Sequence, residues 1–307
     1  MKKAIVNFFK GILVGVANII PGVSGGTIAV ILGVFDELIE AINGFFKNMK
    51  KYIIFLLPIG AGAVIGILGL SKILKPALEQ YPFETNLFFV GLVAGSIPLI
   101  YNKAMSKKFK LTYLIPLVIS LVVVVVLAFI QRPMDEAEIK ALQEVTQSGG
   151  TNASLLVAPK GVGDYIYLLL GGALASAAMV VPGISGSFVM VLIGLYGRII
   201  AATDGLTNPE TMIDALLVLL PVGIGVVAGI FIIAKIIEKL LKHAFSYTYF
   251  AILGLILGSI FSILYSPKTY HTVNGTAVSF GTLTIIIAVL TFAVGFTAAY
   301  FLGKDKE

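Results

Sequence analysis

The sequence predicts an all-α, polytopic integral membrane protein made of two inverted-topology repeats, each a broken or re-entrant helical hairpin followed by three transmembrane helices. The membrane class is predicted by the composition, because 58% of the 307 residues are hydrophobic and only 12% are charged. The mean hydropathy of +1.01 agrees, and a soluble domain carries about 25% charged residues. A Pro-Gly-x-Ser-Gly motif that occurs twice predicts the broken helices. The composition therefore excludes a soluble globular protein.

The first repeat is predicted to occupy residues 1–130. It begins with an apolar segment from about Phe8 to Ile42, which Pro21 and Gly22 interrupt because proline cannot continue a helix. No small-residue cleavage pattern follows the apolar start, so we expect it to be retained. A spanning helix needs about 20 apolar residues. Three later runs come close to that length: Tyr52–Leu74, Thr85–Tyr101 and Leu111–Ile130.

The second repeat is predicted to occupy residues 163–307, after a polar segment at 131–162 that we expect to be an extracytoplasmic loop. It opens with another broken segment, from about Asp164 to Ala202, which is interrupted at Pro182. Together the two repeats form one membrane domain. Three further spans are predicted near Met212–Ile237, Tyr247–Tyr265 and Gly281–Leu302.

Lysines gather at the ends of the predicted segments, and such clusters orient a membrane protein because they stay in the cytoplasm. Both ends of the first broken segment carry lysines, so this segment is predicted to enter and leave on the cytoplasmic side. The acidic loop at 131–162 is placed outside, and both termini are placed in the cytoplasm. The lysines behind this assignment are Lys2, Lys3, Lys10, Lys47, Lys50, Lys51, Lys103, Lys107, Lys108, Lys110, Lys235, Lys239, Lys242, Lys304 and Lys306.

Three blocks of sequence recur in the same order in both halves of the chain. Each copy has a broken segment and three crossings, so the second copy is predicted to be inverted. Inverted repeats with interrupted helices indicate a secondary transporter with its site at the repeat interface, although a duplication kept only for packing gives the same pattern. The matching blocks are 16–27 with 177–188, at a shift of 161, and 56–64 with 219–227 and 91–97 with 254–260, at a shift of 163.

The two interrupted turns are predicted to form an anion site that suits phosphate or carboxylate. Glycine permits backbone angles that expose several N–H groups, and a helix that restarts after the turn adds further donors and a positive dipole end. Irregular backbone persists in a bilayer only where protein buries it or where it lines a cavity. The alternative is a turn that satisfies its own donors with serine caps and binds nothing. The predicted phosphate-binding residues are Pro21, Gly22, Ser24, Gly25, Gly26, Thr27, Pro182, Gly183, Ser185, Gly186, Ser187 and Arg198.

Charged residues follow both turns at equivalent positions. The restarted helices are predicted to end in Gly-Val-Phe-Asp-Glu and Gly-Leu-Tyr-Gly-Arg, which superposes Glu37 on Arg198. Arg198 is predicted to bind phosphate in bidentate geometry. Asp36 or Glu37 is predicted to take up a proton or Na⁺ that couples transport. Anchoring at the membrane interface is the alternative role for these charges.

Two lysines, Lys72 and Lys235, coincide at the 163-residue shift, one late in each following span. Together with Lys75, they are predicted to guide phosphate toward the site. Lysines at helix ends also extend their ammonium groups to the interface without binding a ligand, which is the alternative.

The paired Pro-Gly-x-Ser-Gly motifs, with the segments that end in Glu37 and Arg198, resemble the bacterial DUF368 family over nearly the whole chain. The resemblance implies a flippase of the bacterial cytoplasmic membrane that carries undecaprenyl phosphate from the outer to the inner leaflet. Such transport recycles the lipid carrier of cell-wall polymers. The implied partners are the polyprenyl phosphate lipid and the bilayer. No cofactor is implied beyond a coupling proton or Na⁺.

Two other classes of protein are alternatives. The turns are also similar to those of undecaprenyl-pyrophosphate phosphatases, whose signature is Pro-Gly-x-Ser-Arg-Ser. Gly25 and Gly186 stand at the arginine position and no Glu-x-x-x-Glu pair precedes either turn, so we do not expect an enzyme. A small-anion channel or exchanger is the other alternative. Without cysteine, and with His243 and His271 far apart, we expect no disulfide and no metal site. The net charge of +6 does not indicate a nucleic-acid partner, because in a membrane protein the distribution of lysine and arginine reports orientation first. The sequence leaves the oligomeric state open, a homodimer included.

Overall fold

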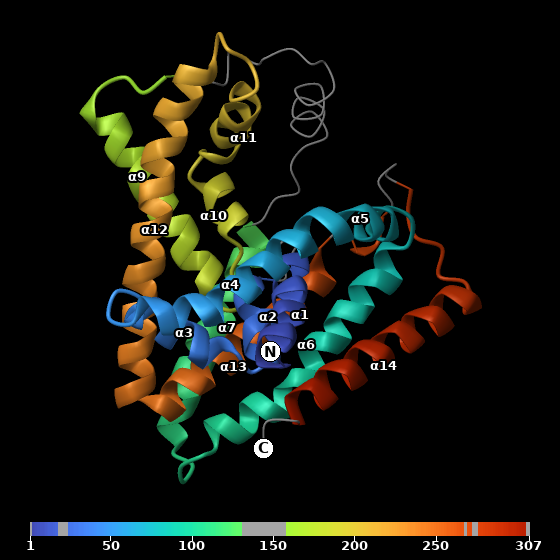
Figure 1. Cartoon of the computed structure of the whole chain (residues 1–307). Helices are drawn as coiled ribbons and strands as arrows, with labels where there is room; N and C mark the ends of the chain where they lie inside the picture. The colour runs from blue at the N-terminus through green and yellow to red at the C-terminus, as the bar shows by residue number, and fades with distance from the viewer. Residues whose placement is uncertain (1, 18–23, 131–157, 267–268, 272–275, 305–307) are drawn as a thin grey trace. The chain divides into compact units, whose positions relative to one another are not determined.

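The computed structural model describes residues 2–17, 24–130, 158–266, 269–271 and 276–304; the side chains of residues 2, 70–73, 75 and 302–304 are outside the description. The described part of the chain is helical apart from turns and an isolated bridge between His271 and Ala277 (Figure 1). Seven of the described helices are long and apolar enough to cross a membrane, or eight if one bent pair counts as a span. The protein is therefore a multi-pass helical membrane protein, which confirms the predicted class.

Six of the seven spanning helices agree with the predicted apolar runs to within six residues, whereas α9 (Val162–Val180) is the first part of the second predicted broken segment. Asn48 caps the first spanning helix by accepting a hydrogen bond from the Lys51 N–H at 3.2 Å. The spanning helices are α4 (Met49–Ile65) with the π-helical stretch η1 (Gly66–Leu70), α6 (Pro82–Ala104), α7 (Leu114–Ile130) after the short η2 (Leu111–Tyr113), α9 (Val162–Val180), α12 (Met212–His243), α13 (Phe245–Tyr265) and α14 (Thr282–Lys304). The shorter helices are α1 (Lys2–Ala17), α2 (Gly25–Ile31), α3 (Phe35–Gly44), α5 (Ser71–Gln80), α10 (Gly186–Leu192) and α11 (Tyr196–Gly205).

One compact unit comprises residues 1–130, 181–184 and 234–307. Within it, α6 packs along α14, α7 packs along α13, α6 and α13 touch each other, and α1 packs on α4 (Figure 1). Glycines bring these backbones together, because a Cβ on Gly91 would meet the Phe292 carbonyl and one on Gly254 the Leu117 carbonyl. Small residues are what allow membrane helices to pack this closely.

The other compact unit comprises residues 131–180 and 185–233, of which 158–180 and 185–233 are described. In this unit α10 packs on α9. Tyr167, on α9, donates a hydrogen bond from its hydroxyl to the carbonyl of Ile193, just after α10. The apolar core of the unit is made by Leu168, Leu195, Ala201, Ala202, Ala215, Val218 and Val222.

Helix contacts recur at the shifts that relate the two sequence copies. In each copy, a Cβ added to a glycine of one helix would meet a backbone carbonyl of its partner helix, first between α1 and α4 and then between α9 and α12. The duplicated sequence therefore builds the same helix pair twice, while the opposed orientation of the copies in a bilayer stays a prediction. The equivalent contacts are Gly11 with the Ile59 carbonyl and Gly62 with the Phe8 carbonyl, then Gly172 with the Val222 carbonyl and Gly225 with the Leu169 carbonyl.

The compact units divide the chain differently from the predicted repeats. The last two helices of the second copy, α13 and α14, pack on α7 and α6 of the first copy and belong to the same compact unit as those helices. The two copies are thus interlocked through α6, α7, α13 and α14, although they are separate in sequence.

Each broken segment contains a second break, which corrects one prediction. The segments α2 and α3 are separate helices, as are α10 and α11, and the latter pair is bent by 107°. Gly33 (φ 61°) and Gly194 (φ 71°) lie at these breaks in the left-handed region, which glycine adopts at little cost. The prediction that the restarted helices end at Glu37 and Arg198 is wrong, because these residues lie in the first turns of α3 and α11.

Candidate functional site

The two interrupted turns meet within one compact unit. The backbone N–H of Gly183, in the second turn, donates hydrogen bonds to Thr27 Oγ1 at 2.8 Å and to Ser24 Oγ at 3.1 Å, in the first turn. Pro182, which precedes Gly183, is buried. The structure therefore brings together two motifs that are about half the chain apart.

The first turn supplies buried hydroxyl groups at fixed positions. Ser24 caps α2, and its Oγ accepts a hydrogen bond from the Thr27 N–H at 3.1 Å and lies 3.0 Å from Thr27 Oγ1. Ser24 is 3% exposed and Thr27 is fully buried, and Gly25 and Gly26 at the start of α2 are also buried. In this conformation the two hydroxyls and the Gly183 amide satisfy one another, so the amide is paired with protein oxygens.

Gly183 is the residue type that the second turn requires. Its φ of 83° is in the left-handed region, where an L side chain is strained. A Cβ on Gly183 would also lie 2.8 Å from both the Leu255 carbonyl oxygen and Ser259 Oγ on α13. Glycine therefore allows the turn to approach α13 and to direct its N–H at the first turn.

The hydroxyls after the second turn are less buried than those after the first. Ser185 begins α10 without a side-chain capping bond, and its Oγ lies 2.8 Å from Ser187 Oγ. Ser187 is exposed, Ser185 is half-buried, and Gly186 is buried against the Ala175 carbonyl. The helices α2 and α10 have only seven residues each. Because the helix dipole sums over aligned peptide units, their dipoles are smaller than those of the longer helices that the sequence predicts after the turns.

Four of the predicted residues are not among the groups described at this site. Pro21 and Gly22 lie outside the described residues. Lys72 lies on α5 with its side chain outside the description, and Lys235 is exposed on α12. Their predicted roles stay predictions.

Asp36 contacts two partners that no local sequence pattern indicates. Lys103 Nζ donates to Asp36 Oδ2 at 2.9 Å, and the Tyr249 hydroxyl lies 2.8 and 2.6 Å from the two carboxylate oxygens. Lys103 Nζ also lies 3.0 Å from the Tyr249 oxygen and 5.2 Å from its ring centroid. Tyr249 is buried, whereas the Asp36 and Lys103 side chains are 38% and 35% exposed. This triad joins α3, α6 and α13.

Arg198 is held in a bidentate pair with Asp164. Its Nη1 and Nη2 lie 2.8 and 2.9 Å from the two carboxylate oxygens, and the side chains are 15% and 23% exposed. An arginine in the first turn of a helix faces an unfavourable dipole, which Asp164 offsets. At the 161-residue shift, Lys3 and Glu37 occupy the positions of Asp164 and Arg198, so the charges are exchanged between the copies. Glu37, in the first turn of α3, has the sign that the dipole favours.

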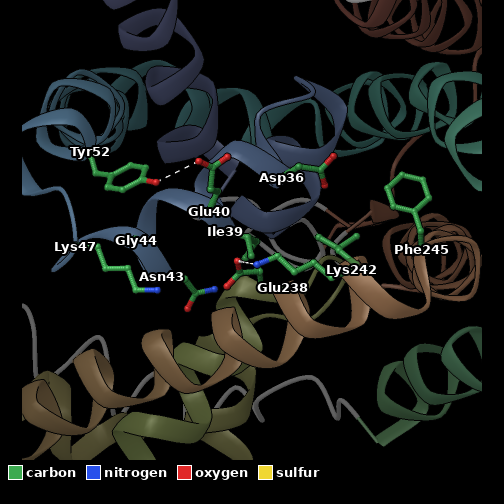
Figure 2. Close-up of a pocket in the computed structure, with 11 residues that line it drawn as sticks. Asp36, Ile39, Glu40, Asn43, Gly44, Lys47, Tyr52, Glu238, Lys242 and Phe245 are labelled. Carbon is green, nitrogen blue, oxygen red and sulfur yellow. Dashed lines mark hydrogen bonds and ion pairs between the residues drawn. The ribbon is translucent and has the colours of Figure 1, made fainter.

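An open cavity of about 530 Å³ lies among α3, α4, α12 and α13 (Figure 2). Glu40 on its wall accepts hydrogen bonds from Lys51 Nζ and the Tyr52 hydroxyl, each at 3.2 Å. These bonds hold the pKa of the Glu40 carboxyl below its usual value. On the opposite wall, Lys242 pairs with Glu238. Within the described residues, no group of three or more His, Asp or Glu side chains is placed to hold a metal ion.

A multi-pass helical protein whose duplicated, interrupted helices meet at a hydroxyl-lined turn has the architecture of a membrane transporter. The chain belongs to the undecaprenyl phosphate translocase-like family, whose sequence model matches residues 14–280. This confirms the family that the paired motifs indicate.

Two curated relatives are similar to the chain over most of its length. The polyprenyl-phosphate transporter of Staphylococcus aureus is 29% identical over 301 residues, which cover 97% of this chain and 96% of that protein. The polyprenyl-phosphate transporter of Vibrio cholerae is 29% identical over 271 residues, which cover 83% of this chain and 75% of that protein. No solved structure matches the chain significantly.

Proposed function

We propose that the protein carries undecaprenyl phosphate from the outer to the inner leaflet of the bacterial cytoplasmic membrane, with both of its termini in the cytoplasm. Family membership and the names of the two relatives support a polyprenyl phosphate as the substrate. The observation that carries the proposal is the contact between the turns, in which the Gly183 N–H bonds to the hydroxyls of Ser24 and Thr27.

The proposed site recognises phosphate by exchanging hydrogen-bond partners. In the closed conformation, the hydroxyl oxygens of Ser24 and Thr27 accept from the Gly183 amide. A phosphate oxygen placed between the separated turns accepts from the same amide, and the hydroxyls rotate to donate to it. Bonds to an ionised acceptor are about twice as strong as neutral ones, so the lipid headgroup competes with the closed contact. The isoprenoid chain stays in the bilayer.

Transport in this scheme requires the turns to part and to close again. The contact between the turns leaves the Gly183 amide satisfied, which avoids the roughly 1–3 kcal/mol that a buried unpaired donor costs. Ser185 and Ser187 are proposed to add hydroxyl donors in the open state. Movement of the elements that carry the two turns then exposes the phosphate to the cytoplasmic leaflet.

Charged residues near the turns are proposed to couple transport to an ion and to guide the phosphate. A proton or Na⁺ at Asp36 or Glu37 gives the transport cycle its direction, and protonation of Asp36 weakens its ion pair with Lys103. Arg198 exchanges Asp164 for the phosphate as the headgroup passes. If Arg198→Ala and Glu37→Gln both translocate lipid at the native rate, the roles of Arg198 and Glu37 are refuted while the turn site stands.

Hydrolysis is not part of the proposal. A phosphoanhydride is cleaved with the help of groups that stabilise the transition-state charge and of an acid, a base or a metal-holding carboxylate. Glycine stands at both positions where the related phosphatases place arginine, Gly25 and Gly186, and both glycines are buried. This supports a carrier over a phosphatase.

Reconstitution into vesicles tests the function with three probes in parallel. Labelled undecaprenyl phosphate is expected to move between leaflets, whereas undecaprenyl pyrophosphate releases no phosphate and small anions do not flow. Vesicles without protein give the background rate. Phosphate release from the pyrophosphate, or anion flux without lipid movement, would overturn the proposal in favour of the phosphatase or the channel.

A further inference from the structure

Two residues that line the cavity beside α3 carry donor groups without an acceptor among the described residues. Asn43 is one of them, and its Nδ2 is shielded from solvent and has no partner in the described part of the chain. Lys47, which follows α3, also lines the cavity, and no described carboxylate lies within ion-pair distance of its ammonium group. Figure 2 shows the Lys47 and Asn43 side chains next to each other at one side of the cavity.

The carboxylates that line the cavity are already neutralised by lysines. Asp36 pairs with Lys103 at 2.9 Å, Glu40 pairs with Lys51 at 3.2 Å, and Glu238 pairs with Lys242. A metal cation would have to displace these ammonium groups before it could bind. An anion meets the opposite situation, because the exposed Lys47 ammonium group is open to it and the unpartnered Asn43 amide gains an acceptor when its side chain turns into the cavity. The cavity therefore favours an anion.

Apolar side chains make up another part of the cavity lining. Ile39 of α3, Leu241 of α12 and Phe245 of α13 all line the cavity. Small-molecule sites commonly combine apolar walls with a few polar groups that fix orientation. A ligand that fits this cavity is a phosphate monoester joined to hydrocarbon, with its phosphate at Lys47 and Asn43 and its first apolar carbons against the apolar side.

We propose that this cavity is a second phosphate site, which receives the headgroup of the transported lipid after it has passed the turns. The proposal rests on the proposed function, since it deepens the same transport path. On the predicted orientation the cavity faces the cytoplasm, where Lys47, Lys50 and Lys51 follow α3. A site there holds the phosphate while the chain enters the inner leaflet, before release.

Protection of Lys47 from acylation tests the site directly. The purified full-length protein in detergent is treated with a small lysine-acylating reagent, and mass spectrometry follows Lys47 and Lys50, which are both exposed. Farnesyl phosphate is expected to slow acylation of Lys47 at least fivefold and to leave Lys50 unchanged, whereas farnesol protects neither. An unchanged ratio of the two rates would overturn the proposal. Equal protection by orthophosphate at the same concentration would assign the site to free phosphate and overturn the lipid assignment.

The variant Asn43→Asp provides a second measurement at almost constant shape. It replaces the amide donor by a carboxylate that repels the ligand. The concentration of farnesyl phosphate needed for the same protection of Lys47 is therefore expected to rise roughly tenfold, which corresponds to the loss of about one charge-assisted hydrogen bond. Native sensitivity in Asn43→Asp would refute the role of Asn43.

Transport assays separate this proposal from the proposed function. If the native protein translocates undecaprenyl phosphate but Lys47 is not protected, the second site fails and the carrier function stands. If Lys47 is protected but no lipid moves between leaflets, the carrier function fails and the cavity is only a binding site.

Discussion

Replacing Gly183 by alanine tests whether the second turn is held against the first by its backbone geometry. An L residue in the left-handed region, at φ 83°, costs about 1–2 kcal/mol. The added Cβ would lie 2.8 Å from the Leu255 carbonyl oxygen and from Ser259 Oγ, and the forced shift costs about 1–3 kcal/mol more. We therefore expect Gly183→Ala to lower the free energy of unfolding by about 2–5 kcal/mol and to move the turn off Ser24 and Thr27.

The assay compares thermal unfolding in detergent with lipid transport in vesicles. Gly223→Ala is the matched control, because nothing lies near a Cβ at Gly223 within α12 and alanine is the better helix former. We expect the control to keep native stability and transport, and Gly183→Ala to lose both. Adding Ser259→Ala removes one of the two clashes and should recover part of the stability. A Gly183→Ala protein as stable and active as the control would refute the geometric argument.

Three further predictions concern the charged pairs and the orientation. Tyr249→Phe removes the hydroxyl that donates to Asp36 and should lower stability by about 1–2 kcal/mol in thermal unfolding; an unchanged midpoint would remove Tyr249 from the triad. A double-mutant cycle of Arg198→Ala and Asp164→Ala should give a coupling energy of about 1–2 kcal/mol, and additive effects would contradict the pair. Because the chain has no cysteine, Ser148→Cys places a single thiol in the 131–162 loop. It should react with an impermeant maleimide from outside the cell, and reaction only from the cytoplasm would reverse the predicted orientation.

The spans and the duplication could be predicted because both depend on local sequence. An apolar run of bilayer length predicts a spanning helix whatever it packs on, and each of the six predicted runs agrees with a spanning helix to within six residues. The repeated glycines pack helices in the same way in both copies. The second break is encoded locally as well, by Gly33 and Gly194, but glycine is also common within membrane helices and therefore does not by itself mark a break.

The partners of the charged residues could not be predicted because they are distant in sequence. Asp36 is 67 residues from Lys103 and 213 from Tyr249, and no local pattern links them. The sequence repeat predicts that the two turns meet. It does not predict that the Gly183 N–H bonds to the hydroxyls of Ser24 and Thr27. That the amide is bonded to hydroxyl oxygens depends on packing that the motif does not specify.

The central claim is that the phosphate passes where the two turns meet, and transport by two Thr27 variants in vesicles tests it most directly. Thr27→Val keeps the volume and loses the hydroxyl bonded to the Gly183 N–H at 2.8 Å, whereas Thr27→Ser keeps the hydroxyl and loses a methyl group. The proposed site predicts that Thr27→Val slows undecaprenyl phosphate transport roughly tenfold, which corresponds to the loss of about one hydrogen bond to a charged group. Thr27→Ser is expected to transport at close to the native rate. Native transport by Thr27→Val, with that variant folded, would contradict the central claim.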